Sequence, residues 1–388
     1  MEWKEDVLGN VLEVKYGKDH KKLADGQYPV YGSGGLMRYV DSKLYDGPSI
    51  LIPRKGTLNN IMFVDNPFWT VDTMFWSIIN TDKVDPKFLF YSICKRDFAS
   101  MNVGSAVPSM TVNILNDIQI SYPKNIDDQR RIASILSSLD RKIELNNKIN
   151  ANLEEMAQAI FKNWFVDFEP FKDGKFVDSE LGRIPEGWKV GKITDIGCLI
   201  TDYVSNGSFA SLKQNVHLYE TKEYAQFIRN TDLKTNTFSV YVDKHSYDFL
   251  SKSTLYGNEI IISNVGDVGS VHLCPKLDIP MTLGNNIIML RPNEKEYNYF
   301  LYLWFKYFSG QGLIQGIKGG SAQPKFNKTD FKNLPLLIPS FEIIERSYWI
   351  FESMFSILSS NVKENSRLSL LRDTLLPRLM SGEIEVPE

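Results

Sequence analysis

The sequence contains the same short motif twice, about half a chain length apart. Residues 104–123 read GSAVPSMTVNILNDIQISYP, and residues 320–339 read GSAQPKFNKTDFKNLPLLIP. Both segments begin with Gly-Ser-Ala, have a proline four residues later (Pro108 and Pro324), and end on a proline, with a constant offset of 216 positions. A chain of 388 residues is also too long for one ordinary core. The repeat therefore predicts a tandem duplication, in which two domains of one fold follow each other.

The similarity extends into the residues that precede each Gly-Ser-Ala motif. Aromatic-rich helical patterns lie at 85–101 and 295–312. Short β-like runs come before these patterns, such as SILIPRKG in the first half and EIIISNVG in the second. A segment that contains a tryptophan opens each half. Because strands, helix, loop and strand follow in the same order twice, the sequence predicts two globular α+β domains.

A long segment without glycine or proline follows the first copy, from residue 127 to residue 168. Its apolar residues recur in alternating steps of four and three, which is typical of a coiled-coil seam. Two asparagines interrupt this seam, at positions where a polar residue fixes the register at some cost in stability. The predicted seam residues are Ile132, Leu136, Leu139, Ile143, Asn146, Asn150, Leu153, Ala157, Ile160 and Trp164.

The same spacing follows the second copy. The predicted seam residues there are Ile344, Tyr348, Phe351, Phe355, Leu358, Val362 and Asn365. Beyond them, Leu368, Leu371, Leu375 and Leu379 indicate a stutter, which is a shift of the seam, and Pro377 is expected to end or kink the helix. Each helix would be about 60 Å long at ~1.5 Å per residue. Since one helix follows each domain, we expect an antiparallel coiled-coil pair and a pseudo-two-fold axis between the halves.

Composition limits the classes of protein that fit. The net charge of −3 lacks the basic excess of most DNA-binding domains, so any binding to DNA must depend on local patches or on a partner. Three scattered cysteines and four histidines give neither a disulfide framework nor a zinc cluster. The polar start resembles no signal peptide, and no uncharged apolar run approaches 18 residues. We therefore expect a soluble cytoplasmic protein without membrane contact.

Two motifs resemble parts of an adenine methyltransferase. VYGSGG (30–35) resembles a glycine-rich cofactor loop, and DNPFW (65–69) resembles the Asn-Pro-Pro-aromatic catalytic loop. The first is followed by residues typical of strand and turn rather than helix, the second lacks its second proline, and no nucleotide-binding Gly-x-x-x-x-Gly-Lys motif occurs. We interpret the chain as non-catalytic and without a cofactor of its own. A methyltransferase, and a protein-binding scaffold without DNA readout, are the alternatives.

The combination of features resembles the specificity subunit of Type I restriction-modification enzymes. The resemblance rests on IPEGW (184–188), LLPRLMSGEI (375–384), YPVYGSGGLMRYVD (28–41) and the alternation of domain and helix. It implies that each variable domain reads one half of a bipartite target in double-stranded DNA, and that the helices set the spacing and dock two methyltransferase subunits. Restriction (translocase) subunits would join this complex. S-adenosylmethionine and ATP would then belong to the partner subunits.

On this basis the chain divides into four parts. They are target-recognition domain 1 (1–122), a central spacer helix (123–178), target-recognition domain 2 (179–338) and a C-terminal spacer helix (339–388). Base reading requires donor forks or amide groups on loops that fit a groove. The DNA-binding candidates on such loops are Tyr31, Ser33, Arg54, Lys55, Asn59, Asn60, Ser105 and Ser109 in the first domain, and Asn264, Asp267, Ser270, Lys318, Ser321, Gln323 and Lys325 in the second. For each residue, an ordinary turn position is the competing interpretation.

Overall fold

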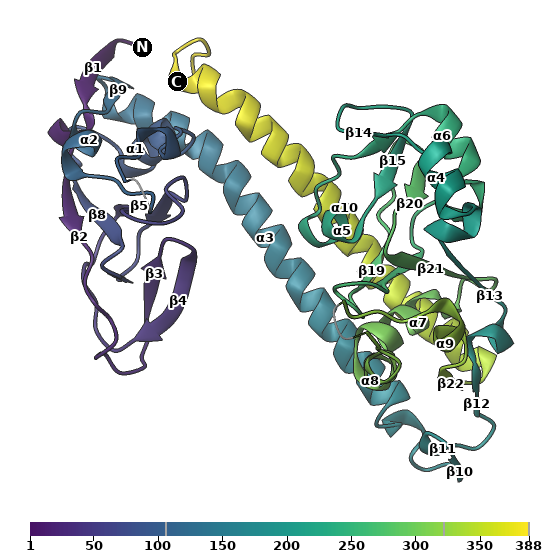
Figure 1. Ribbon diagram of the computed structural model, residues 1–388. Coiled ribbons are helices and arrows are strands. Elements are labelled where there is room, and N and C mark those ends of the chain that lie inside the picture. The colour runs from purple at the N-terminus through teal and green to yellow at the C-terminus, as the bar shows by residue number, and fades with distance from the viewer. Residues whose placement is uncertain (105–106, 321–322, 387–388) are drawn as a thin grey trace. The chain divides into compact units, whose positions relative to one another are not determined.

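The chain forms two compact units (Figure 1). The structure is a computed structural model, and it describes residues 1–104, 107–320 and 323–386. Unit 1 comprises residues 1–147 and 362–388, and unit 2 comprises residues 148–361. Each unit contains one globular domain together with one part of each of two long helices. We call the globular parts domain 1 and domain 2.

Domain 1 is built on a four-stranded antiparallel sheet with the strand order β2-β8-β5-β6. These strands are β2 (Leu12–Tyr16), β8 (Met74–Ile79), β5 (Ser49–Pro53) and β6 (Met62–Val64). A second sheet, with the order β4-β3-β7, contains β4 (Gly35–Val40), β3 (Tyr28–Gly32) and β7 (Trp69–Thr70). The remaining elements are the pair β1 (Trp3–Val7) and β9 (Gln119–Pro123), and the helices α1 (Pro86–Ile93) and α2 (Val112–Asn116).

Domain 2 repeats this plan with the strand order β13-β21-β18-β19. These strands are β13 (Cys198–Asp202), β21 (Ile287–Pro292), β18 (Ile260–Ser263) and β19 (Val271–Leu273). Its second sheet contains β14 (Leu218–Tyr219), β16 (Tyr241–Val242), β15 (Ala225–Ile228), β20 (Met281–Leu283) and β17 (Thr254–Leu255). The other elements are the pair β12 (Lys189–Lys192) and β22 (Pro335–Ile338), the hairpin β10 (Phe176–Ser179) and β11 (Gly182–Pro185), and the helices α4 (Phe209–Asn215), α5 (Asn230–Thr235), α6 (Lys244–Phe249), α7 (Tyr297–Lys306), α8 (Phe308–Gly316) and α9 (Lys328–Lys332).

The two domains share strand pairing as well as strand order. In domain 1, β3 pairs antiparallel with β4 and parallel with β7. In domain 2, β15 pairs antiparallel with β16 and parallel with β20. The central strands β5 and β18 are buried along their whole length, as expected for apolar runs covered on both faces. The predicted α+β class and the internal repeat are confirmed.

The aromatic helices are shorter than the sequence patterns predict. α1 ends at Ile93, and only a short 3-10 turn, η2 (Ala99–Met101), follows it within the expected span. The second pattern forms two helices, because the backbone changes direction between α7 and α8, where Phe308 has a left-handed φ of 56°. Gly310 makes the sharp turn possible, since a Cβ atom there would lie 2.3 Å from the Trp304 carbonyl oxygen. The aromatic residues of α7 are buried in the core of domain 2.

The long helices are α3 (Ile126–Phe165) and α10 (Phe341–Met380), each of 40 residues. In unit 1, Asp140 accepts from Arg372 at 2.7 Å, and six residues later Asn146 donates to Asn365 at 2.9 Å. In unit 2, Asn150 accepts from Asn361 at 2.8 Å, and further along α3 the ring of Phe161 lies 6.5 Å from that of Phe351. Contacts move backwards along α10 as they move forwards along α3. The helices are therefore antiparallel within each unit, as predicted.

The seam of α3 follows the predicted positions. All ten are buried or half-buried, and Asn146 is only 1% exposed. The stutter predicted in α10 is contradicted at one of its four positions: Leu371 is 46% exposed, whereas Leu368 and Leu375 are half-buried and Leu379 is 2% exposed. Ser369, Arg372 and Leu376 continue the unshifted steps of four and three beyond Asn365 and are also at least half-buried. Arg372 was not among the predicted seam residues, but its guanidinium occupies the seam by pairing with a carboxylate of α3.

The proline in α10 does not end the helix, which was one of the two outcomes predicted for it. α10 continues beyond Pro377 to Met380, so the proline lies in the last turn. Pro377 has no N–H group, so the carbonyl of Asp373 lacks its usual intrahelical donor. At a helix end this loss disturbs few further hydrogen bonds. None of the described helices is both long and apolar enough to cross a membrane.

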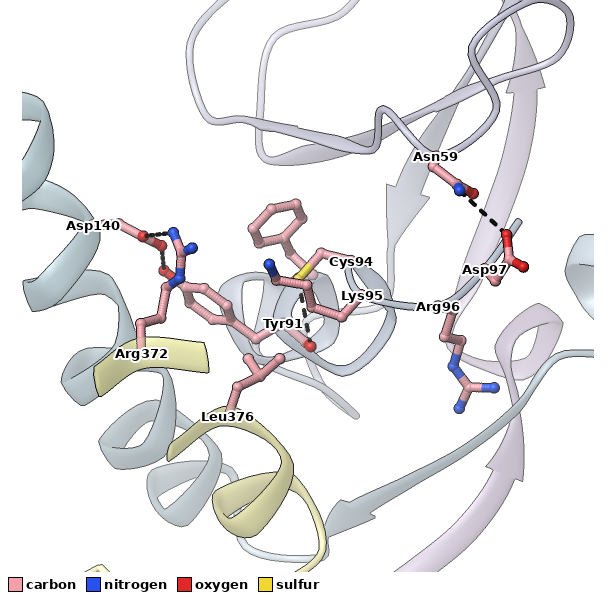
Figure 2. Close-up of a pocket in the computed structure, with 10 residues that line it drawn as sticks. Asn59, Tyr91, Cys94, Lys95, Arg96, Asp97, Asp140, Arg372 and Leu376 are labelled. Atoms are coloured by element: carbon pink, nitrogen blue, oxygen red, sulfur yellow. Dashed lines mark hydrogen bonds and ion pairs between the residues drawn. The ribbon is translucent and has the colours of Figure 1, made fainter. Parts of the chain in front are cut away.

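Domain 1 is attached to the two helices around a cavity of about 440 Å³. Figure 2 shows Tyr91 of α1 and Arg372 of α10 reaching the same carboxylate, that of Asp140 on α3. The Tyr91 hydroxyl donates to Asp140 Oδ2 at 2.6 Å, while Arg372 Nη1 donates to Oδ1. Burial and this carboxylate together raise the pKa of Tyr91, which keeps its proton on the donor side of the bond. Three elements of unit 1 are thus fixed by one side chain.

Candidate nucleic-acid interface

Three loops of domain 1 meet beyond the end of β5. They are the turn Ser33–Gly34 between β3 and β4, the β5–β6 loop (54–61), and the Gly-Ser-Ala loop, described at 102–104 and 107–110. The main-chain N–H of Gly56 donates to the carbonyl of Pro108 at 3.2 Å, and that of Met110 donates to the carbonyl of Arg54 at 2.9 Å. The Asn60 amide donates to the Ser33 carbonyl at 2.8 Å. We call this group the first loop cluster.

The corresponding loops of domain 2 meet in the same way. They are the β15–β16 connection (229–240), the β18–β19 loop (264–270) and the second Gly-Ser-Ala loop, described at 318–320 and 323–326. Gly266 N–H donates to the Pro324 carbonyl at 2.9 Å, and Phe326 N–H donates to the Asn264 carbonyl at 3.0 Å. These bonds match those of Gly56 and Met110 in domain 1. We call this group the second loop cluster.

A glycine is required at the same point of both clusters. Gly56 has φ 90° and Gly266 has φ 78°, values in the left-handed region that side-chain-bearing residues rarely adopt. A Cβ atom on Gly56 would also lie 2.9 Å from the Ser33 hydroxyl. The glycine therefore allows the β5–β6 loop to turn and to approach the neighbouring β3–β4 turn closely.

The candidate side chains of domain 1 differ in whether they already have interaction partners within the protein. Lys55 is exposed and has no ion pair among the described residues. The Arg54 guanidinium lies 5.3 Å from the ring centre of Tyr16 and contacts the Asp72 carbonyl at 3.4 Å. Asn59 is bound on both sides of its amide, to Asp97 and to the N–H of Ala99, so it supports the fold of its own loop.

The other candidates of domain 1 lie at the edge of the cluster. Asn60 donates to the β3–β4 turn, at the carbonyl of Ser33. Tyr31 is half-buried in β3, and burial raises the pKa of its hydroxyl. Ser109 forms an isolated bridge with Lys55, and its N–H donates to Asn102. Ser105 lies outside the described residues.

The candidates of domain 2 lie around the β18–β19 loop. Asn264 is half-buried, and its amide oxygen has no hydrogen-bond partner among the described residues. Ser270 bonds to Nε2 of His272 at 2.8 Å, and burial lowers the pKa of that imidazole to about 4, so the ring is neutral. Asp267 accepts from Lys234 at 2.6 Å and from Asn230 at 3.2 Å.

The second Gly-Ser-Ala loop contributes further exposed polar groups to this cluster. Gln323 and Lys325 are exposed, and the Lys325 main chain bridges to Gly319 and Val265. Lys318 is also exposed, with its ammonium 3.4 Å from the amide oxygen of Gln315. Ser321 lies outside the described residues.

Sequence reasoning missed two residues of the second loop cluster, Asn230 and Lys234. Both belong to α5, which lies in the β15–β16 connection. The corresponding connection in domain 1 is only Ser33–Gly34, so the first half offered no counterpart from which to predict α5. Aligning the β3–β4 hairpin with the β15–β16 hairpin would have identified the insertion and its cationic residue.

Neither enzyme-like motif forms a cofactor site. The glycines of VYGSGG lead into strand β4, as predicted from the residues that follow them, and not into a helix. In DNPFW, Phe68 is fully buried in the core beside β7. Among the described residues, no group of three or more His, Cys, Asp and Glu side chains could hold a metal ion.

Comparison with known proteins decides the family. A family model described as the Type I restriction modification DNA specificity domain matches residues 1–155 and 185–368. The chain belongs to this family. The two matched segments each contain one globular domain and much of the long helix that follows it.

Relatives along most of the chain agree with this assignment. The Type I restriction enzyme MjaIX specificity subunit of Methanocaldococcus jannaschii is 28% identical over 95% of this chain and 86% of its own length. The HindI specificity subunit of Haemophilus influenzae is 27% identical over 83% of each chain. A crystal structure of the S subunit from M. genitalium superposes with a TM-score of 0.66 at 17% identity, covering 97% of this chain and 96% of that one.

The family establishes the general role of the chain. Specificity subunits supply DNA sequence specificity to a Type I restriction-modification system, and they are not its catalytic subunits. They bind DNA and act in complexes with methyltransferase and restriction subunits. The resemblance inferred from the sequence is therefore confirmed, and neither a methyltransferase nor a scaffold without DNA readout is supported.

Proposed function

We propose that each domain reads one half of a bipartite target in double-stranded DNA through its own loop cluster. One observation carries this proposal: the same three loops meet in both domains, and matching main-chain hydrogen bonds join two of them, but the loops present different side chains. Sequence is read by side-chain contacts to base edges, so two clusters with a shared backbone arrangement and different side chains can read different sequences. On this proposal the DNA-facing residues are those of the two clusters, among which Lys55, Gln323 and Lys325 are exposed.

The charge of the chain fits a reader that works with partners. Its net charge is −3, and Lys234 of the second cluster is already paired with a carboxylate. Non-specific affinity for DNA comes mainly from phosphate contacts by lysine and arginine. We propose that the partner subunits, which close around the same duplex, supply most of those contacts. The complex would then work in the cytoplasm, where the target DNA is.

The long helices are proposed to set the spacing of the two half-sites and to dock two methyltransferase subunits, with the restriction subunits joining them. Support comes from large apolar side chains that the seam leaves exposed. Leu145 and Met156 of α3 are 52% and 51% exposed, and Trp349 and Ile357 of α10 are 59% and 49% exposed. Exposed apolar and aromatic groups on a rigid element are typical of a protein interface. S-adenosylmethionine and ATP would bind to those partners.

Exchange of one domain tests whether each domain reads its own half-site while the helices set the spacer. Residues 1–122 would be replaced by the corresponding domain of another family member, within the proposed parts 1–122, 123–178, 179–338 and 339–388. Methylome sequencing of cells that express the complete complex should then show one changed half-site, one unchanged half-site and the same spacer. A change in both half-sites would contradict independent reading by the two domains.

A further inference from the structure

The second loop cluster contains an exposed carboxylate, whereas the first contains none. The sequence of the first cluster, residues 33–34, 54–61 and 102–110, has no aspartate or glutamate. In the second cluster, the side chain of Asp267 is 50% exposed at the β18–β19 loop. A negative charge on a surface that faces DNA phosphates is repelled by them. Its presence there therefore requires a reason other than general affinity for DNA.

The carboxylate of Asp267 is held in one position. Its Oδ2 atom accepts from Lys234 Nζ at 2.6 Å and from Asn230 Nδ2 at 3.2 Å, both on α5. The loop around it is fixed by the Gln311 amide, which donates to the carbonyl of Gly269 at 2.9 Å, and by the Gly266–Pro324 bond. A carboxylate has about four acceptor positions, so the two bonds from α5 leave acceptor capacity on Oδ1.

The ionisation state of Asp267 makes it an acceptor. Lys234, followed by smaller contributions from Asn230 and Ser270, lowers the pKa of this carboxyl below its usual value of 3.8, against the effect of burial. At neutral pH the group therefore has no proton to donate. In the DNA major groove, the donors are the exocyclic amino groups of cytosine N4 and adenine N6, whereas guanine and thymine present acceptors at the equivalent positions.

We propose that Asp267 is a specificity-determining residue of domain 2, whose carboxylate accepts a hydrogen bond from the exocyclic amino group of a cytosine or an adenine in the major groove. Lys234 and Asn230 are positioning residues: they orient the carboxylate, and Lys234 balances its charge against the phosphates. This inference rests on the proposed function, that domain 2 reads a half-site. It assigns one base position of that half-site to one side chain.

A simple surface ion pair is the competing explanation, and the chain offers a matched control for it. Lys244 and Asp248 of α6 form an exposed pair at 3.1 Å in the same domain, outside the loop cluster. Removing either carboxylate removes one lysine–aspartate contact. Only the removal of Asp267 should change which DNA sequence is recognised.

The experiment is methylome sequencing of cells that express the complete complex with Asp267→Ala, Asp267→Asn or Asp248→Asn. A well-placed base contact discriminates by ~1–3 kcal/mol, or about 5- to 150-fold. We expect Asp267→Ala to relax one position of the domain 2 half-site, occupied by cytosine or adenine in the wild-type motif, with that loss of discrimination. The domain 1 half-site should stay unchanged, and Asp248→Asn should leave the whole motif unchanged. The wild-type motif itself distinguishes cytosine from adenine.

Substitutions of Lys234 provide a second test, because a purely structural residue would not change which base is recognised. Lys234→Met should relax the same base position, and Lys234→Arg should restore it, because arginine can hold the carboxylate in a similar way. Thermal unfolding of each purified chain checks that the variants are folded. Asp267→Asn keeps the size of the side chain and replaces Asp267→Ala if the alanine variant does not fold.

Several results would overturn the inference. They are an unchanged motif with full modification in Asp267→Ala, a change in the domain 1 half-site, or loss of all modification by a folded variant. Exchange of residues 179–338 separates this inference from the proposed function. If that exchange changes one half-site while Asp267→Ala changes none, the inference is wrong and the proposed function stands. If the exchange changes neither half-site, the proposed function itself is wrong.

Discussion

The two domains share a backbone arrangement but support their loop clusters differently. In domain 1, the β5–β6 loop is held by side chains of short loops, such as Asn59 with Asp97. In domain 2, two additional helices support the equivalent loop: α5 through Asn230 and Lys234, and α8 through Gln311 and Gln315. The bonds common to both domains are main-chain bonds at Gly56 and Gly266. Because those bonds need no particular side chain, except at the glycine itself, the rest of each loop is free to diverge.

The largest expected effect, on the free energy of unfolding, tests whether both domains depend on a continuous coiled-coil seam. Inserting two residues between Asn146 and Leu153 would rotate Leu153, Ala157 and Ile160 off the seam by about 200° at ~3.6 residues per turn. We expect a loss of several kcal/mol in the free energy of unfolding, since Ala157 is fully buried and the seam residues Leu153 and Ile160 are half-buried. Urea denaturation measures the loss.

A four-residue insertion at the same place is the control, because it adds about one turn and keeps the seam approximately in phase. It lengthens the helix by about 6 Å, so the spacer between half-sites should grow by about one or two base pairs at ~3.4 Å each. Each added base pair also turns one half-site by roughly 35°. Unchanged half-sites with a longer gap in the methylome are expected. An active complex with an unchanged gap would rule out a spacing role for the helices.

The attachment of each domain to its helices gives the second prediction. In unit 1, Tyr91 donates to Asp140, and Arg372 also binds that carboxylate. In unit 2, Tyr299 donates to Glu352 at 2.5 Å, and Glu352 forms no ion pair among the described residues. Tyr299→Phe should therefore destabilise the chain more than Tyr91→Phe does. Hydrogen bonds to charged groups contribute about 1.5–3 kcal/mol. We therefore expect a loss near the upper end of that range for Tyr299→Phe and near the lower end for Tyr91→Phe. Equal losses in urea denaturation would show that Arg372 does not compensate.

Exposed lysines give a smaller effect that distinguishes affinity from specificity. Lys55 of the first cluster and Lys325 of the second are exposed, and neither forms an ion pair in the described part of the chain. Replacing either with alanine should weaken binding of the complete complex to all DNA sequences equally. The slope of log binding constant against log salt should fall by about 0.9 for each phosphate group that the complex no longer neutralises. A changed recognition motif, instead of a changed slope, would make that lysine a base reader.

The smallest effect is a pH dependence that only the second cluster should show. The pKa of Asp267 is lowered in the folded chain, so its pairing stabilises the fold above the usual pKa of 3.8 and is lost as the pH falls through the lowered value. Both partners are about half-exposed, which limits the contribution to under about 1 kcal/mol. The stability difference between the wild type and Asp267→Asn should be present at pH 7 and shrink towards pH 3. A difference that grows as the pH falls would contradict the ion pair.

The seam and the repeat could be predicted because they depend on residue type and spacing alone. That rule did not predict Arg372, because this residue is not apolar and fills its seam position by pairing with Asp140. The short strands that precede each aromatic helix also followed from sequence pattern, but the full number of strands and the pairing of β15 with β20 did not, since parallel partners lie far apart in sequence.

The candidate site was predicted at the level of loops rather than residues. The β5–β6 and Gly-Ser-Ala loops were named from the sequence as DNA-binding candidates, and the structure brings them together in each half through main-chain bonds that have no sequence signature. Asn59 has the side chain of a base reader, yet its amide is used by Asp97 and Ala99. Lys234 was missed because α5 exists only in domain 2.

The asparagines of the long helices show what the duplication means for the origin of the chain. Asn146 donates to Asn365, and Asn361 donates to Asn150. The two donors, Asn146 and Asn361, lie 215 positions apart, and so do the two acceptors, Asn150 and Asn365. Each pair therefore occupies equivalent positions of the repeat. A half-length ancestor with one domain and one helix would have formed both bonds as a homodimer, from a single pair of asparagines. On the proposed function, a substitution in such an ancestor would alter both half-sites at once, whereas duplication and fusion of its gene would allow the two half-sites to diverge.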